Sequence, residues 1–131
     1  MKDAVILIIK DPLGRYLFIR RHPNDSFGGY WCPISGAVEP GEDHAATVAR
    51  EAREETGIEV RPVRKVGEMP TRNGEYLLHW WIAELVSGEA RVAEPNAIDA
   101  VAWAYPHEFE SLRPNFEEDM EFIRKQDLIR S

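Results

Sequence analysis

The sequence contains a single cysteine, Cys32, among its 131 residues. One cysteine cannot form an intramolecular disulfide, and it cannot supply a cysteine-rich zinc site. This scarcity is typical of a protein in a reducing cytoplasm, and we expect that location. Long apolar runs are also absent near the N-terminus, where only residues 4–9 are continuously apolar. Such a run is too short for a signal-peptide core or a membrane span, so we expect a buried strand.

Positive charge is scarce as well. The 16 Lys and Arg residues are outnumbered by 23 Asp and Glu residues, which gives a net charge of −7. An acidic domain lacks the basic surface that attracts duplex nucleic acid or an anionic membrane, and we expect neither as a partner. A phosphate compound would instead need a bound cation between it and the protein. Repeats and low-complexity tracts are missing too, so residues 1–131 are expected to form one domain.

The pattern of apolar residues and turn signals predicts alternating strands and helices. Strands are expected at residues 4–9, 16–21, 34–38, 60–66, 76–86 and 100–105, and residues 22–30 form a loop by composition. One helix is expected from the cap Asp43 to Thr56, ended by Gly57. A second is expected from a capping box at Asn115 and Glu118 to about residue 129. The fold class predicted from this pattern is α/β with a mixed sheet.

The predicted helix at residues 43–56 carries three clustered acids. Winding it at about 100° per residue places its core face on one arc, made of Ala45, Val48, Ala49, Ala52 and Thr56. Glu51, Glu54 and Glu55 share a second arc, where like charges repel one another. One interpretation is an ordinary solvated face with ion pairs. The other is a site for a hard divalent cation such as Mg²⁺ or Mn²⁺, which prefers carboxylate oxygens.

A longer pattern decides between these interpretations. Gly36 is followed by five residues, Glu42, seven residues, and then the run REAREETGI from Arg50 to Ile58. This resembles the Nudix box, G-x5-E-x7-R-E-U-x-E-E-x-G-U with U aliphatic, and all seven fixed letters match. One departure precedes the box, where the Pro-Gly pair common in the family is replaced by Ile34-Ser35. The resemblance implies the Nudix α/β/α sandwich, with a mixed β-sheet and a helix that holds divalent metals against a diphosphate.

The resemblance also implies roles for the residues of the box. Glu51 and Glu55 correspond to the main metal ligands, with Glu54 assisting and the Gly36 carbonyl joining them. Glu51 has a second reading, as the group that orients or deprotonates the attacking water. Arg50 corresponds to the residue that orients the glutamates, and Glu42 supports the loop and the cluster.

Several residues outside the box are weaker candidates. Arg20 and Arg21 end a strand where family members place a phosphate-binding cation, and strand alternation allows only one to face the site, with Arg20 preferred. Glu94, in a Glu-Pro pair nine residues before Trp103, is a candidate base or further metal ligand, with Asp99 behind it. Each can equally be an ordinary surface residue. Candidates for stacking on a base are the aromatic residues Phe27, Tyr30, Tyr76, Trp80 and Trp81, of which Tyr76 is taken as a substrate contact.

The function predicted from these residues is Mg²⁺-dependent or Mn²⁺-dependent hydrolysis of a nucleoside diphosphate linked to another moiety, X. A nucleoside triphosphate is the preferred substrate, and dinucleoside polyphosphates and nucleotide sugars are alternatives. A second hypothesis is a domain that senses a nucleotide without turnover. It is disfavoured because every glutamate of the box is kept. The expected partner is a small-molecule nucleotide or nucleoside diphosphate derivative, and a homodimer is the assembly considered.

Overall fold

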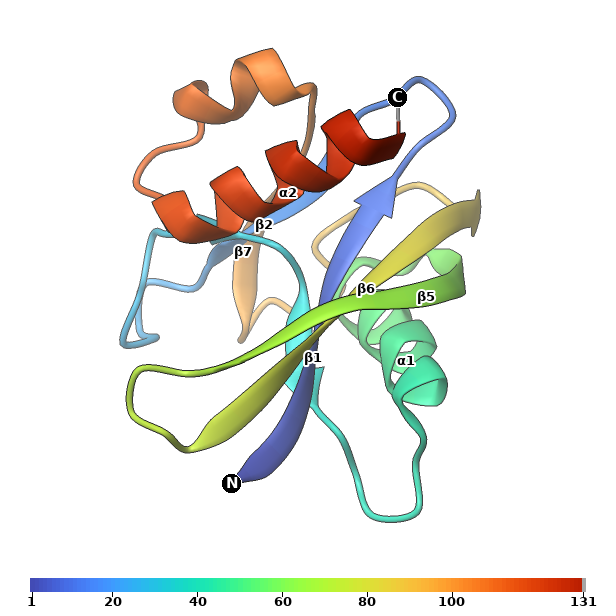
Figure 1. Cartoon of the computed structure of the whole chain (residues 1–131). Coiled ribbons are helices and arrows are strands. Elements are labelled where there is room, and N and C mark those ends of the chain that lie inside the picture. Colours follow the sequence, from blue (N-terminus) through green and yellow to red (C-terminus); the bar gives the residue numbers. More distant parts are fainter. Residues whose placement is uncertain (131) are drawn as a thin grey trace.

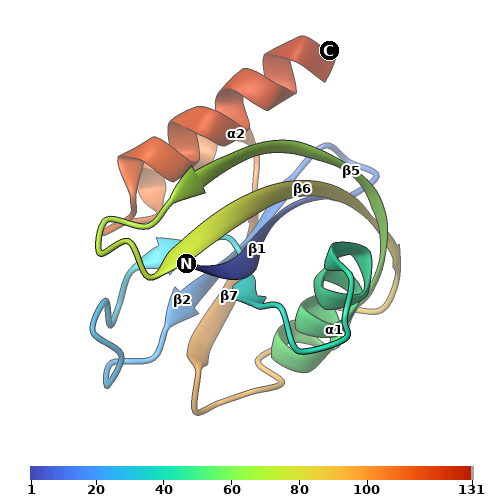
Figure 2. The ribbon, with the colours of Figure 1, turned by 60° about the horizontal axis from the view of Figure 1, so that its bottom comes forward.

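The computed structural model describes residues 1–130, in which a mixed β-sheet lies between two α-helices (Figures 1 and 2). The strands are β1 Lys2–Lys10, β2 Tyr16–Arg21, β3 Trp31–Cys32, β4 Ser35–Ala37, β5 Glu59–Pro70, β6 Tyr76–Ser87 and β7 Ile98–Ala104. The helices are α1 His44–Thr56, the 3₁₀ helix η1 Pro106–Ser111, and α2 Glu117–Arg130. Figure 2 shows α1 on one side of the sheet and α2 on the other. The predicted α/β/α sandwich is confirmed.

Strand β1 is the centre of the sheet. It runs parallel to β6 along its whole length and antiparallel to β4 through residues 4–6. Its C-terminal end meets β2, and β2 pairs in turn with β3 and β7. On the far side, β5 forms an edge of the sheet by pairing antiparallel with β6. Parallel and antiparallel pairs therefore occur in one sheet, as the fold class requires.

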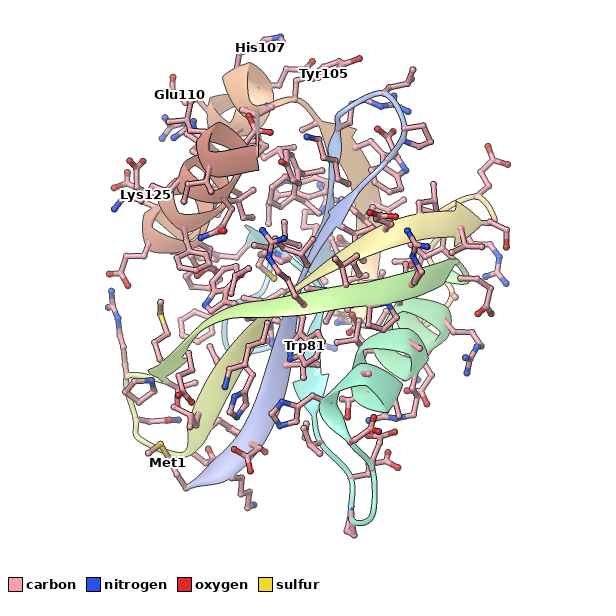
Figure 3. All side chains as sticks on the ribbon, turned by 45° about the vertical axis from the view of Figure 1, so that its right-hand side comes forward. Met1, Trp81, Tyr105, His107, Glu110 and Lys125 are labelled. Atoms are coloured by element: carbon pink, nitrogen blue, oxygen red, sulfur yellow. The ribbon has the colours of Figure 1, made fainter. Side chains whose placement is uncertain are left out.

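Alternation along β1 builds a separate core on each face of the sheet. Val5, Leu7 and Ile9 pack on the face that α1 covers, whereas Ile6 and Ile8 pack on the face that α2 covers. Residues 4–9 are all at most 5% exposed, which confirms the expectation of a strand buried on both sides. The same alternation sends Trp80 and Trp81 to opposite faces, and Figure 3 shows Trp81 beside α1.

Some boundaries differ from the sequence prediction. The strand expected at residues 34–38 is present as β4 at residues 35–37, which pair with β1, whereas the short strand β3 at residues 31–32, which pairs with β2, was not predicted. Strand β7 begins at residue 98 instead of 100. Strand β5 extends to residue 70 instead of 66, and its pairing with β6 contains three register shifts between residues 59 and 67. Bulges of this kind break the two-residue period that sequence patterns depend on.

The capping box expected at Asn115 is not formed. The Asn115 side-chain amide donates a hydrogen bond to the Leu112 carbonyl at 2.6 Å, and α2 begins two residues later, at Glu117. The helix η1 precedes it and was not predicted. Of the helices within residues 1–130, none combines the length and the apolar composition needed to cross a membrane.

Candidate active site

The helix α1 has well-defined ends, which fix the position of every charge on it. The Asp43 side chain accepts a hydrogen bond from the Ala46 N–H at 2.8 Å, as an N-cap residue does. Gly57 ends the helix in the left-handed conformation with φ 76°, and its N–H donates to the Arg53 carbonyl at 2.9 Å. The predicted start and stop of this helix are both confirmed.

The buried face of α1 differs from the predicted core arc. The residues buried there are Thr47, Val48, Glu51, Ala52 and Thr56, and Ala45 and Ala49 are only partly covered. The helix is turned so that one of its acids, Glu51, points inward. A Cβ atom on Gly36 would overlap the Glu51 carboxyl group, so the glycine makes room for this inward position. The structure thereby brings together two residues of the predicted metal site, Gly36 and Glu51.

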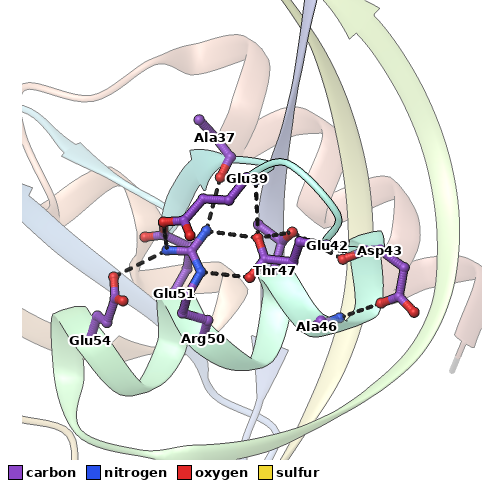
Figure 4. A network of polar contacts seen from close by, with 9 residues as sticks. All are labelled: Ala37, Glu39, Glu42, Asp43, Ala46, Thr47, Arg50, Glu51 and Glu54. Atoms are coloured by element: carbon purple, nitrogen blue, oxygen red, sulfur yellow. Dashed lines mark hydrogen bonds and ion pairs between the residues drawn. The ribbon is translucent and has the colours of Figure 1, made fainter.

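Arg50 connects the acids of the site, and all five of its N–H groups are used (Figure 4). Nε donates to Glu42 Oε2 at 2.7 Å and Nη2 donates to Glu42 Oε1 at 2.9 Å. Nη2 also donates to the Ala37 carbonyl at 3.0 Å. Nη1 donates to Glu51 Oε1 at 2.9 Å and to Glu54 Oε2 at 3.2 Å. Arg50 therefore holds the carboxylates in fixed directions, as its predicted orienting role requires.

The environment of Glu42 favours its ionised form. Hydrogen bonds from Arg50, and then from Thr47, lower the pKa of the Glu42 carboxyl to about 2. Conversely, the pKa of Arg50 is raised, first by its hydrogen bonds to Glu42. The pair is thus a permanent ion pair at physiological pH, with the planar fork of the guanidinium matched to the carboxylate.

Glu51 and Glu55 have the opposite electrostatic environment. Burial raises the pKa of Glu51 to about 7, against the opposing effect of Arg50. Burial also raises the pKa of Glu55 to about 8, and repulsion from Glu51 and Glu94 adds to the shift. The Glu55 Oε2 atom is shielded from solvent and has no hydrogen-bond partner. Both acids are therefore held where burial opposes their ionised forms, and for Glu51 the charge of Arg50 offsets only part of that effect, which is a common property of functional sites.

The loop after β6 brings Glu94 towards these acids. The Ala93 N–H donates to the Glu55 carbonyl at 2.9 Å, which ties the loop to the C-terminal turn of α1. The Glu94 carbonyl accepts hydrogen bonds from the N–H groups of Ala97 and Ile98. The negative charge of Glu94 raises the pKa of both Glu51 and Glu55, so its carboxylate belongs to the same electrostatic cluster.

The two strand-end arginines have different surroundings. Arg20 donates to Asp99 at 2.6 Å and lies over the Trp31 ring. Asp99 is thus a partner of Arg20. Arg21 donates twice to Asp25, at 3.0 and 3.1 Å.

The Arg21 charge lowers the pKa of the box residue Glu55 against the effect of burial. Both arginines remain predicted substrate contacts.

The aromatic candidates are dispersed over the molecule. Trp80 is 0% exposed in the core beneath α2, so it cannot line a site, and Trp81 contacts His44 at the start of α1. The Tyr76 ring lies beneath the Lys2 ammonium at 5.9 Å, at the start of β6. Phe27 and Tyr30 pack on Phe116, with ring centroids 5.2 and 4.8 Å from it. Tyr76 stays a predicted substrate contact.

The oxygen-rich cluster fits a hard divalent cation. Its candidate donors are the carboxylates of Glu51, Glu54 and Glu55 and the Gly36 carbonyl, and one carboxylate oxygen of Glu55 is buried without a partner. Among residues 1–130, no three Asp, Glu, His or Cys side chains converge as a complete metal-ligand set. Arg50 draws one oxygen each of Glu51 and Glu54 towards itself, so a cation would compete with the guanidinium for these carboxylates.

Two residues of this network, Thr47 and Glu39, were not predicted from the sequence. The Thr47 hydroxyl lies 2.7 Å from Glu42 Oε1, and Glu39 Oε1 lies 3.4 Å from Arg50 Nη1. Both occupy free positions of the box. The signal for Thr47 is its place one turn before Glu51, which puts it on the same side of the helix.

Curated relatives are similar to part of this chain. The NAD-capped RNA hydrolase NudC of Mannheimia succiniciproducens is 37% identical over 87 residues, which are 66% of this chain and 33% of that protein. The NAD-capped RNA hydrolase NudC of Photobacterium profundum is 33% identical over 98 residues, covering 75% of this chain and 36% of that protein. The chain thus spans about a third of the length of these relatives.

Solved structures resemble nearly the whole chain. The MutT protein from Methanosarcina mazei Go1 has a TM-score of 0.81 at 22% identity, covering 99% of this chain and 95% of that one. The MutT NUDIX hydrolase from Burkholderia pseudomallei has a TM-score of 0.75 at 26% identity, covering 94% of this chain and 95% of that one. The family model described as NUDIX domain matches residues 1–126. Together with the complete box on α1, this match shows that the chain belongs to the Nudix hydrolase family.

Proposed function

We propose that this protein is a divalent-cation-dependent pyrophosphohydrolase that cleaves the diphosphate linkage of a nucleoside diphosphate linked to X. The observation that carries the proposal is the pair Glu51 and Glu55: Glu51 is buried, the Glu55 Oε2 atom is shielded from solvent without a partner, and their pKa values are raised to about 7 and about 8. A fold gains nothing from burying two repelling acids, but such a pair suits a cation site. Both acids occupy fixed positions of the Nudix box.

The residues of the site divide the chemical work. Glu51, Glu54, Glu55 and the Gly36 carbonyl would hold Mg²⁺ or Mn²⁺. When bound, the ion neutralises diphosphate charge and lowers the pKa of a coordinated water. Arg50 keeps the carboxylates of Glu51 and Glu54 in position through its two Nη1 hydrogen bonds.

Residues from outside the box complete the proposed mechanism. The Glu94 carboxylate is the candidate acceptor of the proton that leaves the attacking water, because it belongs to the same cluster and lies on a loop. Arg21 and Arg20 would contact the substrate phosphates, and Tyr76 would contact another part of the nucleotide.

A substrate panel tests the proposal. Purified protein with Mg²⁺ is incubated with nucleoside triphosphates, NAD⁺, a diadenosine polyphosphate and a nucleotide sugar, and phosphate is measured after coupling to phosphatase or pyrophosphatase. NAD⁺ is included because the curated relatives carry the name NAD-capped RNA hydrolase. We expect nucleoside triphosphates to be cleaved.

The panel also separates the competing functions. Saturable binding of one nucleotide without turnover would support the sensing domain and refute the hydrolase. The matched variants are Glu51→Gln, which should lower kcat at least about 10²-fold, and Glu89→Gln, an exposed position that should leave turnover unchanged.

A further inference from the structure

Thr47 is a buried hydroxyl that the family pattern does not require. It is 0% exposed, and it occupies one of the seven free positions between Glu42 and Arg50. Its Oγ1 atom lies 2.7 Å from Glu42 Oε1 and 3.0 Å from the Asp43 carbonyl. Its backbone N–H already donates to that same carbonyl at 3.1 Å, as the first turn of a helix requires.

The chemistry of the contact fixes its direction. Glu42 is ionised, because Arg50 donates hydrogen bonds to both of its carboxylate oxygens. An ionised carboxylate can only accept hydrogen bonds. The Thr47 hydroxyl must therefore be the donor, and it has one hydrogen for two acceptors. The contact to Glu42 is the shorter one and is charge-assisted, so it is the stronger of the two.

Glu42 lies on a segment that gives it little other support. Residues 39, 40, 41 and 43 around it are exposed. Three residues donate hydrogen bonds to its carboxylate: Glu39 from the same exposed segment, Arg50, and Thr47. Of these donors, only Thr47 is fully enclosed in the core of the protein. Its rotamer is held by packing, so it can set the position of the Glu42 carboxylate.

The position of Glu42 determines the position of the guanidinium. Glu42 accepts hydrogen bonds from Nε and from one hydrogen of Nη2, and these two bonds fix the plane of the Arg50 guanidinium. The two Nη1 hydrogens then point to Glu51 and Glu54 at 2.9 and 3.2 Å. A shift in the fork therefore moves the carboxylates that would hold the cation. Figure 4 shows this chain of contacts from Thr47 through Glu42 to the acids of α1.

We propose that Thr47 is a positioning residue of the site, which acts through Glu42 and the Arg50 fork to direct Glu51 and Glu54. The catalytic consequence rests on the proposed hydrolase function, whereas the structural link from Thr47 to Arg50 does not.

Three substitutions of buried threonines test the link. Thr47→Val keeps the shape and removes the donor, and Thr47→Ser keeps the donor and loses a methyl group. The matched control is Thr56→Val, because Thr56 is also 0% exposed on α1 but its hydroxyl donates to the Ala52 carbonyl at 2.8 Å. We expect Thr47→Val to lower kcat about tenfold with KM changed less than about twofold, since the orientation of the site is lost. Thr47→Ser and Thr56→Val should stay within about threefold of the parent.

A double-mutant cycle shows whether Thr47 acts through Glu42. In a Glu42→Gln background, adding Thr47→Val should change kcat less than about twofold, because the Glu42 carboxylate through which Thr47 acts has already been removed. A further tenfold loss in that background would overturn the proposal, because it would mean that Thr47 acts by another route. If Thr47→Val fails to fold, Thr47→Ala, which removes the hydroxyl and adds no atom, takes its place.

A readout without turnover separates this inference from the proposed function. The Arg50 Nε–H signal in ¹⁵N NMR spectra, assigned by its loss in Arg50→Lys, reports the bond to Glu42. We expect faster solvent exchange of this signal in Thr47→Val and parental exchange in Thr47→Ser. A protein that hydrolyses nothing but shows this pattern would refute the function alone. Parental kcat and parental exchange in Thr47→Val would overturn the positioning role alone.

Discussion

Replacing Glu55 by glutamine should make the metal-free protein more stable at pH 8 and change its stability much less near pH 5. Burial, with repulsion from Glu51 and Glu94, raises the pKa of Glu55 to about 8. Its Oε2 atom is shielded from water and lacks a partner, so the ionised form is poorly solvated. Glutamine has nearly the same volume and helix propensity but carries no charge, and it therefore resembles the protonated parent.

The sign and size of the effect follow from linkage. A glutamate in the unfolded chain has a pKa near 4.5, so the folded protein binds this proton more tightly than the unfolded chain does. The resulting stabilisation is fully present below pH 4.5 and is lost as the pH rises through 8. At about 1.4 kcal/mol per unit, the loss between pH 5 and pH 8 is about 3 kcal/mol. For a domain of this size that is on the order of 10 °C in Tm.

Urea unfolding at 25 °C in EDTA, measured from pH 5 to pH 8, checks this prediction. The parent should lose stability across this range, and Glu55→Gln should lose about 3 kcal/mol less. The control is Glu89→Gln, an exposed position whose curve should follow that of the parent. Adding Mg²⁺ at pH 8 should stabilise the parent more than the Glu55 variant. Parallel curves for the parent and Glu55→Gln would refute the reasoning that burial opposes the ionisation of Glu55.

Three further predictions concern activity. Excess EDTA should abolish hydrolysis, and Mg²⁺ or Mn²⁺ should restore it; turnover that persists in EDTA would contradict the cation site. Glu51→Gln should lower kcat at least about 10²-fold with folding retained, and a variant with near-parental turnover on a confirmed substrate would show that this helix is not catalytic. Arg50→Ala should impair kcat more than Arg53→Ala, because Arg50 donates five hydrogen bonds within the site whereas Arg53 donates to the exposed Glu59. Equal rates for the two arginine variants would remove the orienting role.

Local patterns in the sequence were sufficient for much of the fold. The cap Asp43 and the stop Gly57 define α1, because both act through backbone groups within a few residues of themselves. The continuous apolar run at residues 4–9 correctly predicted a strand buried on two faces. The two-residue strand β3 was not predictable, since it exists only through its pairing with the distant strand β2.

In the candidate site too, features set by nearby residues were predictable from the sequence, and features set by contacts between distant segments were not. The spacing of the box glutamates indicated the acid cluster correctly. The rotation of α1 that buries Glu51 and Thr47 depends on the space above Gly36, which no helical period encodes. Likewise, strand alternation predicts that Arg20 and Arg21 face opposite sides, but the effect of the Arg21 charge on Glu55 depends on the folded arrangement.

All N–H groups of Arg50 are hydrogen-bonded within the protein, and this affects how the proposed anionic substrate would approach the site. The arginine donates every N–H group it has to neighbours in the protein, so it has none left for an incoming phosphate. The surroundings are acidic, with a net charge of −7 for the chain. Long-range attraction therefore does not accelerate the encounter, and added salt screens repulsion instead of attraction. If the proposed nucleotide substrate binds, we expect its association to become faster with rising ionic strength, the reverse of the behaviour of a protein that attracts phosphate with an unpaired guanidinium.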